Sequence, residues 1–401
     1  MNQDNTWLLP EGIDELLPAQ ARSLEVLRRD LLDCYAAWGY ELVITPFIEF
    51  LESLLTGTGK DLDLQTFTLT DQVSGRQLGV RADITPQAAR IDAHRLRHQA
   101  PTRLCYIGSV LRTLGDGFSG SRSPLQIGAE LYGHAGVESD VEIVCLMMET
   151  LRVSGMIDVY LDLVHVGIDR ALARGSGLNE RQEAELFEAL QRKATTEIEA
   201  LVRGFGLDDS LSDMLIALAE LNGDAEVLQR ARRVLADAPA EVAEAIDYVE
   251  AVAAQLSKEL PGLPVHFDLA ELRADHYQTG VVFAAFVPGE GQEVARGGRY
   301  DKIGEVFGRA RPATGFSADL KTLMRLGSHT GQALTGAVLA PSGFDAGLGA
   351  KIAELRANGT VVVRELPGQT GDPVEMGCTY RLQEQAGGWD LVPLQPSTEK
   401  R

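Results

Sequence analysis

The chain has 401 residues, of which 45% are apolar and 24% charged, and its formal net charge is -21. This composition is ordinary for a soluble globular protein, and the length predicts two or three domains. So acidic a chain, without a dense run of lysine and arginine, repels phosphate backbones, which argues against tRNA or another nucleic acid as a partner.

Cysteine spacing and the N-terminus predict the compartment. The four cysteines lie far apart and none forms a C-x-x-C pair, which argues against a disulfide framework or a thiolate metal site. The polar start lacks the basic and apolar parts of a signal peptide, and no apolar stretch approaches the ~18 residues that a membrane span needs. We therefore expect a cytoplasmic protein, with no metal and no cofactor, and with no membrane as a partner. The cysteines are Cys34, Cys105, Cys145 and Cys378.

The first 90 residues predict a long helix followed by β structure. Apolar residues recur at helical spacing over 19–37, and a strand is expected over 41–50. Two further strands, 66–69 and 77–80, form a probable hairpin. The run V-R-A-D-I-T-P then predicts a strand that ends at Asp83 and a helix that Thr85 caps. Asp83 could alternatively serve only to cap that helix.

Residues 104–133 hold the most informative stretch of the chain. An apolar strand carrying Arg112 is followed by a glycine-containing loop, and a second strand carries Gln126 and Glu130. Their spacing of four places both side chains on one face of an extended chain. A cation on one strand and polar acceptors on the other could hold a zwitterion, although an ordinary hairpin with solvated polar residues explains the residues equally well.

The rest of the chain predicts a helical block and a small final domain. A helix is expected over 137–153, and residues 169–260 are almost entirely helical in pattern. Strands return from 261, and a last helix is expected between Gly315 and Gly327. A strand, a helix, a strand and a hairpin then follow within 336–401.

The motifs together resemble those of class II aminoacyl-tRNA synthetases, and in particular the histidyl enzyme, over about four-fifths of the chain. The helix before G-Y-E and the strand ending at Pro46 resemble motif 1, which forms the dimer interface in that family. Residues 104–133 look like motif 2. The resemblance implies an α+β fold with an antiparallel sheet flanked by helices. It assigns 1–168 and 261–327 to this core, 169–260 to a helical insertion and 336–401 to a small α/β domain.

The resemblance also implies a pocket for a histidine-like amino acid. In the family an acidic residue at a strand-to-helix corner meets the ammonium group, and Asp83 occupies that position. A zwitterion needs acceptors for its ammonium group, which Asp83, Gln126 and Glu130 could supply, and a cation for its carboxylate, which Arg273 could supply. The run that begins at Arg273 is similar to the second histidine-recognition motif, in which two tyrosines follow the arginine. Tyr277 matches the first tyrosine, and Gln278 replaces the second. Arg112 matches the motif 2 arginine.

Two positions depart from the catalytic pattern. Leu114 stands where the family has a glutamate, and Thr322 stands where motif 3 has the arginine that stabilises phosphate charge. Lys321 is adjacent, but a shift of one residue turns a helical side chain by ~100°, so it should not substitute. We therefore expect no catalytic residues.

The pattern more closely resembles a non-catalytic paralogue of the synthetase, the regulatory subunit of ATP phosphoribosyltransferase. That family implies a separate short-form catalytic subunit as partner, a role in the first step of histidine biosynthesis, and feedback inhibition by free histidine. Self-association through the N-terminal helix and strand is also expected. The alternatives are an active histidyl-tRNA synthetase and a free-standing histidine-binding sensor.

Overall fold

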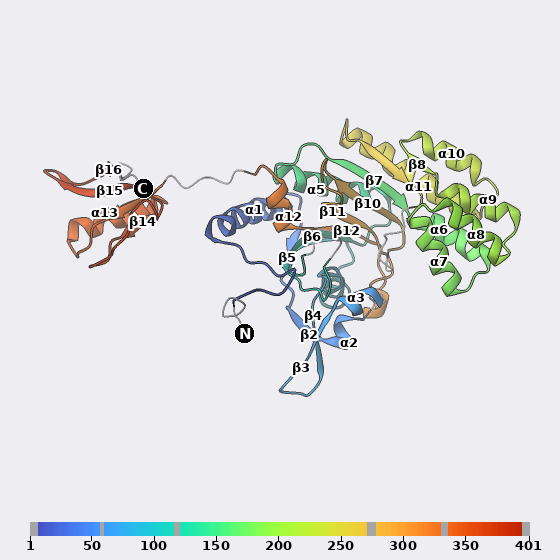
Figure 1. The fold of residues 1–401 in the computed structure, drawn as a ribbon, viewed down its shortest axis with the longest axis horizontal. Helices are drawn as coiled ribbons and strands as arrows, with labels where there is room; N and C mark the ends of the chain where they lie inside the picture. Colours follow the sequence, from blue (N-terminus) through green and yellow to red (C-terminus); the bar gives the residue numbers. More distant parts are fainter. Residues whose placement is uncertain (1–6, 57–59, 116–120, 271–277, 330–335, 395–401) are drawn as a thin grey trace. The chain divides into compact units, whose positions relative to one another are not determined.

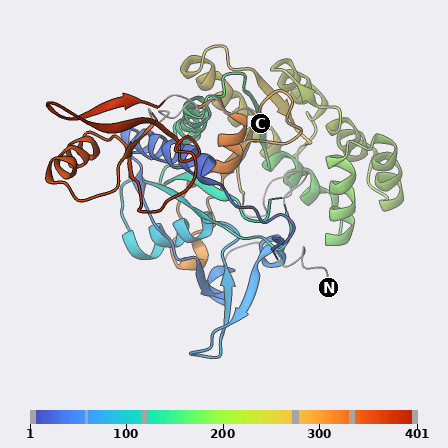
Figure 2. The same ribbon diagram turned by 60° about the vertical axis from the view of Figure 1, so that its left-hand side comes forward.

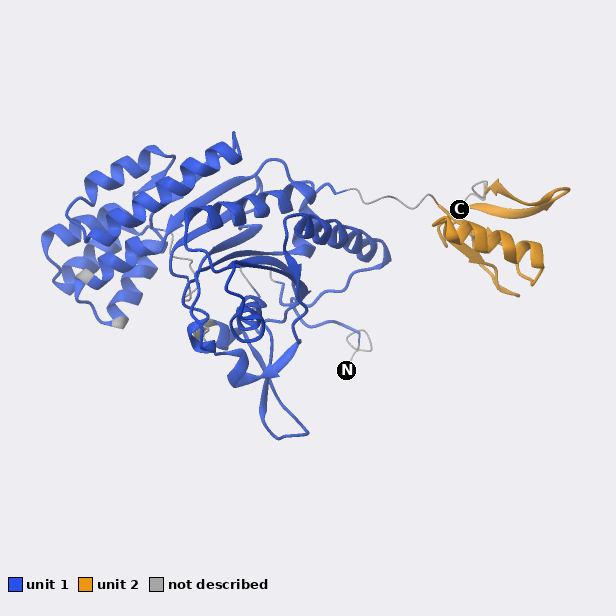
Figure 3. Ribbon diagram, turned by 180° about the vertical axis from the view of Figure 1, so that it is seen from behind, with its two compact units in different colours: residues 1–329 blue, residues 330–401 orange. Residues whose placement is uncertain are grey.

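The computed structural model describes residues 7–56, 60–115, 121–270, 278–329 and 336–394 (Figure 1). The chain divides into two compact units, Met1–His329 and Thr330–Arg401, which Figure 3 shows in separate colours. The larger unit holds a nine-stranded sheet and those residues of the predicted pocket that the structure describes. No helix among the described residues is long and apolar enough to cross a membrane.

A mixed sheet of nine strands forms the centre of the larger unit. Its order is β1-β5-β6-β12-β11-β10-β7-β9-β8. The pairings from β5 to β7 are all antiparallel, and the parallel pairs β1–β5 and β7–β9 lie towards the two edges. The strands are β1 (Glu41–Leu42), β5 (Thr102–Ser109), β6 (Leu125–Tyr132), β7 (Tyr160–His165), β8 (Asn222–Gly223), β9 (Val265–Asp268), β10 (Val281–Phe286), β11 (Ala295–Arg299) and β12 (Ala313–Asp319).

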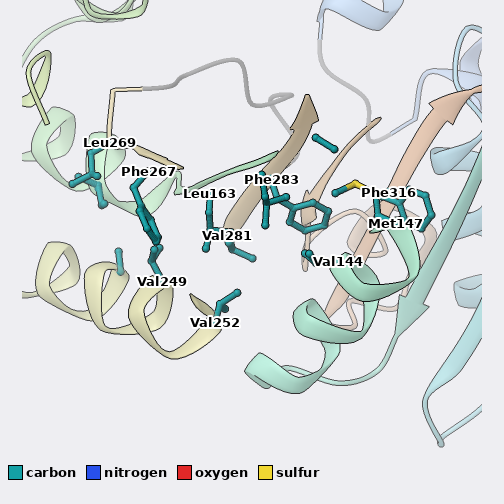
Figure 4. Close-up of a cluster of buried hydrophobic side chains, with 14 of the residues drawn as sticks. Val144, Met147, Leu163, Val249, Val252, Phe267, Leu269, Val281, Phe283 and Phe316 are labelled. Atoms are coloured by element: carbon teal, nitrogen blue, oxygen red, sulfur yellow. The ribbon is translucent and has the colours of Figure 1, made fainter. Parts of the chain in front are cut away.

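Helices α1 (Pro18–Ala37), α5 (Val137–Val153) and α12 (Leu320–Leu326) pack together on one face of this sheet. Helix α1 begins with proline, whose fixed φ suits the first turn, and it buries Leu27, Leu31 and Tyr35 at a spacing of four. In Figure 4, Val144 and Met147 of α5 face Phe283 and Phe316 of the sheet. The odd-numbered side chains of β6 belong to this apolar layer. Because side chains alternate along a strand, the even-numbered ones point to the other face of the sheet.

Helices α6 to α11 form a helical block at the β7 end of the sheet (Figures 1 and 2). The longest of them, α11, packs on α5, α6 and β7, and its valines contact Phe267 and Val281 in the core shown in Figure 4. The block therefore shares one continuous core with the sheet. Its helices are α6 (Gly167–Ser176), α7 (Glu180–Gln191), α8 (Thr195–Phe205), α9 (Asp209–Leu218), α10 (Glu226–Val234) and α11 (Ala240–Glu259).

The opposite face of the sheet is covered by α4 (Thr85–Arg90), which continues into a π-helix, η2 (Ile91–Leu96). A three-stranded sheet of order β2-β4-β3 precedes them in the chain. The remaining elements of the larger unit are β2 (Ile48–Phe50), α2 (Leu51–Leu54), α3 (Lys60–Gln65), β3 (Phe67–Thr70), β4 (Gln77–Val80) and the short 3-10 helix η4 (Glu305–Phe307).

Five sequence-based expectations need correction. The strand expected to end at Asp83 is β4, which ends at Val80, and the strand expected to carry Arg112 is β5, which ends at Ser109. The strand expected over 41–50 is two short strands in different sheets, because Pro46 cannot donate to a ladder. Residues from Gly315 to Asp319 belong to β12, and the helix begins only at Leu320, where the Asp319 carboxylate accepts two backbone N–H groups. Helix α4 is not capped by a Thr85 side chain, since Thr85 is its first residue.

The smaller unit is a four-stranded sheet of order β14-β13-β15-β16 with one helix, α13 (Ala346–Ala357). Asp345 caps this helix by accepting from the Leu348 N–H, and the helix buries Leu348, Ile352 and Leu355 against the sheet. The predicted order of strand, helix, strand and hairpin is confirmed here. The strands are β13 (Ala337–Ala340), β14 (Val362–Arg364), β15 (Cys378–Gln385) and β16 (Gly388–Pro393).

Candidate functional site

A small polar cavity of ≈ 40 Å³ lies on the face of the sheet that is turned away from α5. Strand β6 contributes Gln126 and Glu130 to it, as their spacing predicted, and both side chains are buried. Four of the six predicted pocket residues line this cavity, since Asp83 and Arg112 join them. The other two, Arg273 and Tyr277, lie outside the described residues. The full lining is Asp83, Thr85, Arg112, Gln126, Glu130, Gln278, Arg296, Gly297, Gly298, Tyr300, Gly315, Phe316 and Ser317.

Glu130 is the most deeply buried charge-bearing group of the cavity, with 1% of its surface exposed. It faces Gly315 across the β6–β12 ladder, and a Cβ at that glycine would overlap the Glu130 carboxylate. The hydroxyl of Tyr106 donates to one oxygen at 2.9 Å, and the hydroxyl of Tyr300 donates to the other. Burial raises the pKa of Glu130 to about 8, although both tyrosine hydrogen bonds oppose that rise.

Asp83 and Gln126 form a second polar cluster beside Glu130. The Gln126 amide donates to Asp83 Oδ1 at 2.6 Å, and its carbonyl accepts from the backbone N–H of Ile84 at 2.9 Å. The same Asp83 oxygen accepts from the Thr85 N–H at 3.0 Å. Asp83 therefore supports the first turn of α4, as its alternative assignment predicted, and also lines the cavity.

Local sequence patterns do not mark the two tyrosines that donate to Glu130. Tyr106 and Tyr300 come from β5 and from the end of β11, and only the sheet register brings them to one carboxylate. One local signal is the sequence G-G-R-Y-D at 297–301, because its two glycines line the cavity. A Cβ at Gly297 would overlap the carbonyl oxygen of Gly315 and the Phe283 ring.

A second cavity of ≈ 140 Å³ adjoins the first and shares Arg112, Gln126, Arg296 and Ser317 with it. Thr322 lines this outer cavity, whereas Lys321 turns away and donates to Asp14 at 2.9 Å and to the Ser123 carbonyl at 2.8 Å. The predicted rotation of Lys321 out of the site agrees with this geometry.

The guanidinium groups of the outer cavity lie close to carboxylates. Arg325 is 3.4 Å from Glu290, and Arg296 is 3.5 Å from Glu293. The Thr322 hydroxyl donates to Asp319 at 2.8 Å, so it serves the start of α12. Among the described residues no cluster of three or more histidine, cysteine or acidic side chains could hold a metal ion. The lining of this cavity holds as many carboxylates as guanidinium groups, so it has no excess of positive charge for a phosphate.

Glu130→Gln is expected to flatten the pH dependence of the free energy of unfolding between about pH 5 and pH 8. The ordinary pKa of a glutamate is 4.5, and burial raises that of Glu130 to about 8 in the folded chain. Between these values the folded state holds a proton that the unfolded state has released, so the free energy of unfolding falls as pH rises, by about 1.4 kcal/mol per pH unit.

Urea unfolding at pH 5, 6, 7 and 8 measures this slope in both chains. The glutamine of the variant does not titrate in this range. The free energy of unfolding of the variant should therefore fall less steeply with pH than that of the wild-type chain, by about 1.4 kcal/mol per pH unit. Identical slopes in the two proteins would contradict a protonated Glu130 in the folded state.

Comparison with known proteins gives these cavities their context. A family model described as Histidyl-tRNA synthetase matches residues 12–323, and one described as ATP phosphoribosyltransferase subunit HisZ C-terminal domain matches residues 335–392. The ATP phosphoribosyltransferase regulatory subunit of Alkalilimnicola ehrlichii is 59% identical over 395 residues, which cover 98% of this chain and 98% of that protein. The chain belongs to the family of ATP phosphoribosyltransferase regulatory subunits. A protein with the same description from Thioalkalivibrio sulfidiphilus is 58% identical to this chain. The aligned residues cover 98% of this chain and 100% of that protein.

Solved structures agree with this family and confirm the predicted class II synthetase fold. A protein of Bacillus halodurans, described as an ATP phosphoribosyltransferase regulatory subunit/histidyl-tRNA synthetase, superposes with a TM-score of 0.81 at 27% identity, covering 94% of this chain and 97% of that chain. Histidyl-tRNA synthetase from Nostoc superposes with a TM-score of 0.75 over 95% of this chain and 92% of its own. At 18% identity the second likeness concerns the fold alone.

Proposed function

We propose that the chain is the non-catalytic subunit of a short-form ATP phosphoribosyltransferase, that it activates a separate catalytic subunit, and that free histidine binds in the inner cavity and inhibits the assembly. The contrast between the two cavities carries this proposal. The inner one keeps the polar side chains of Asp83, Gln126 and Glu130, whereas the outer one has Thr322 where the synthetase family holds phosphate with arginine. A chain that recognises an amino acid without activating it is suited to regulation.

The inner cavity offers the groups that a free amino acid needs. A carboxylate and an amide beside each other, Asp83 and Gln126, are acceptors for an ammonium group. Arg112 supplies a cation at the boundary between the two cavities, and its Nε donates to the Ala82 carbonyl at 3.2 Å. Arg273 and Tyr277 belong to the same proposed pocket on the resemblance alone. The cavity of ≈ 40 Å³ now has room for only a few waters, so its lining must move apart to admit an amino acid.

Histidine must bind one arrangement of the complex more tightly than another if it is to inhibit the reaction. A coupling free energy of about 1–3 kcal/mol would change the equilibrium between the two arrangements roughly 5- to 150-fold. The test of the proposed function is the rate of the phosphoribosyltransferase reaction with and without this chain. An active synthetase is the less favoured alternative, because it requires phosphate chemistry at Thr322, and a free-standing histidine sensor would leave that rate unchanged.

Self-association through the segment after α1 is part of the proposal. This segment, residues 41–48, begins with the edge strand β1 and ends at the first residue of β2, and it exposes Leu42, Ile44, Phe47 and Ile48. Contiguous exposed apolar residues at a sheet edge are typical of an interface. A second copy of the chain, joined about a two-fold axis, would bury the same residues on both sides.

Ile44→Asp is therefore expected to convert the dimer into a monomer, because it places two like charges at the centre of a two-fold interface. Ile44 is 84% exposed in the single chain, so the substitution should leave the fold of the monomer intact. The molar mass measured by light scattering reports the change. The matched control is Ile157→Asp, since Ile157 is equally exposed but lies before β7. A dimer that persists in the Ile44 variant, or that is lost in both, would contradict this interface.

A further inference from the structure

A groove of ≈ 1320 Å³ lies on the larger unit, beside the outer cavity. Its walls are the chain before α1, the first turns of α1, helix α12 and the loop between β10 and β11. Helices α1 and α12 lie side by side in Figures 1 and 2. Sites for small molecules usually hold about 300–1,000 Å³. The volume of this groove therefore suits a segment of another protein better than a small ligand.

The wall before α1 is held in place by contacts with distant parts of the unit. The Asp14 carboxylate accepts from Lys321 of α12 at 2.9 Å and from the Ser123 hydroxyl at 3.1 Å. The Gly12 carbonyl accepts from the Arg122 N–H at 2.7 Å. This side of the groove is therefore fixed in the free chain, and a partner need not pay the entropy of ordering it.

The groove carries more negative than positive charge. Five carboxylates line it, against one lysine and one arginine. Both of these cations already lie within 3.4 Å of a carboxylate. Glu11 and Glu15 are exposed, and within the described part of the chain neither side chain makes a hydrogen bond or an ion pair. Electrostatic complementarity therefore requires a partner that brings cationic groups.

Apolar side chains are exposed on both sides of these glutamates. Leu8 and Leu9 are 70% and 49% exposed, and Leu17 is 63% exposed. Exposed apolar residues that gather beside polar ones are typical of a surface that binds another protein. The occupant that fits both features is an extended segment with basic and apolar side chains.

The groove is the outermost of three adjoining cavities. It shares Asp319, Thr322 and Arg325 with the outer cavity, which in turn shares Arg112 and Gln126 with the inner one. A segment bound in the groove would therefore contact walls that continue to the amino-acid cavity.

We propose that this groove is the docking site for a basic, extended segment of the catalytic subunit. The inference rests on the proposed function, and it adds the surface through which this chain meets its partner. A second copy of the chain fits the groove less well, because it carries the same net charge of -21 and would bring further negative charge to Glu11 and Glu15.

The double variant Glu11→Lys/Glu15→Lys is expected to bind purified catalytic subunit about tenfold more weakly at low salt, because attraction at two positions becomes repulsion. Calorimetric titration of the full-length chain measures the dissociation constant. The difference from the wild-type chain should shrink as the salt concentration rises from about 0.05 M to about 0.5 M, since salt screens exposed charges.

The matched control is Asp237→Lys/Glu244→Lys, which makes the same change of charge at exposed positions before and on α11. It should bind the catalytic subunit as the wild-type chain does. All the groove carboxylates that cap or pair with other groups are left in place in both variants. The thermal midpoint of each should therefore equal that of the wild-type chain.

Leu17→Ser tests the apolar side of the groove. Serine is favoured at the residue that precedes a helix, where Leu17 lies, so α1 should be kept. Binding of the catalytic subunit should weaken about fivefold at low and at high salt alike, because burial of apolar surface is not screened. The matched control is Leu366→Ser in the smaller unit, where the leucine is 66% exposed.

Equal binding by the wild-type chain and the Glu11/Glu15 variant would overturn the inference, as would an equal loss in that variant and its control. A change in the molar mass of the free chain would overturn it too, because it would assign the groove to a second copy. A wild-type chain that binds no catalytic subunit would refute the proposed function itself. Binding and activation that the groove variants leave unchanged would refute the docking site alone.

Discussion

The wild-type chain is expected to catalyse no histidine-dependent exchange of pyrophosphate into ATP. A synthetase must stabilise the charge of the transferred phosphoryl group, and fixed cations in a water-poor site do this. Thr322 carries no charge, and its hydroxyl is bound to Asp319. Loss of one such preorganised donor commonly lowers the rate about 10²- to 10³-fold.

The remaining arginines of the outer cavity do not replace the missing one. Arg325 and Arg296 lie beside Glu290 and Glu293, so a triphosphate would meet carboxylates together with the guanidinium groups. Leu114, where the family has a glutamate, is 69% exposed and offers no acceptor. Exchange is measured with radiolabelled pyrophosphate against a control without protein. Exchange above that control, lost in Arg112→Ala, would contradict the non-catalytic assignment.

The polar face of β6 could be predicted from the sequence because it depends on local periodicity alone. A spacing of four in an extended strand places Gln126 and Glu130 on the same face, and this does not depend on the tertiary structure. The helix over 137–153 could be predicted for the same reason, because its apolar residues repeat at helical spacing. The structure confirms it with the same bounds. The motif resemblance then identified the family to which the chain belongs.

The parts that could not be predicted depend on contacts between distant segments. Nothing local marks Tyr106 and Tyr300 as donors to one carboxylate, and nothing local shows that Arg170 of the helical block donates to the main-chain carbonyl of Gln278. The sequence predicts helix from Gly315 onward because a short apolar run fits either a helix or a strand. Residues from Gly315 to Asp319 form a strand instead because they pair with β6 and β11. The boundaries of the helical insertion at 169–260 stay a prediction.

A short-form catalytic subunit that is nearly inactive alone is expected to become active when this chain is added. A partner that binds the active arrangement preferentially shifts the population towards it. A preference of about 1.4 kcal/mol is enough for a tenfold change in the equilibrium. Since no phosphate chemistry is assigned to this chain, the gain must arise from assembly, and it should saturate as the catalytic subunit becomes fully bound.

The measurement that tests this most directly follows the phosphoribosyltransferase rate in mixtures of purified catalytic subunit, ATP and phosphoribosyl pyrophosphate. The chain is titrated into these mixtures, and complex formation is monitored in parallel by sedimentation. We expect the rate to rise tenfold or more with the fraction of catalytic subunit bound, and to fall again when histidine is added. Equal rates with and without the chain, in mixtures where the complex has formed, would contradict its assignment as the activating subunit.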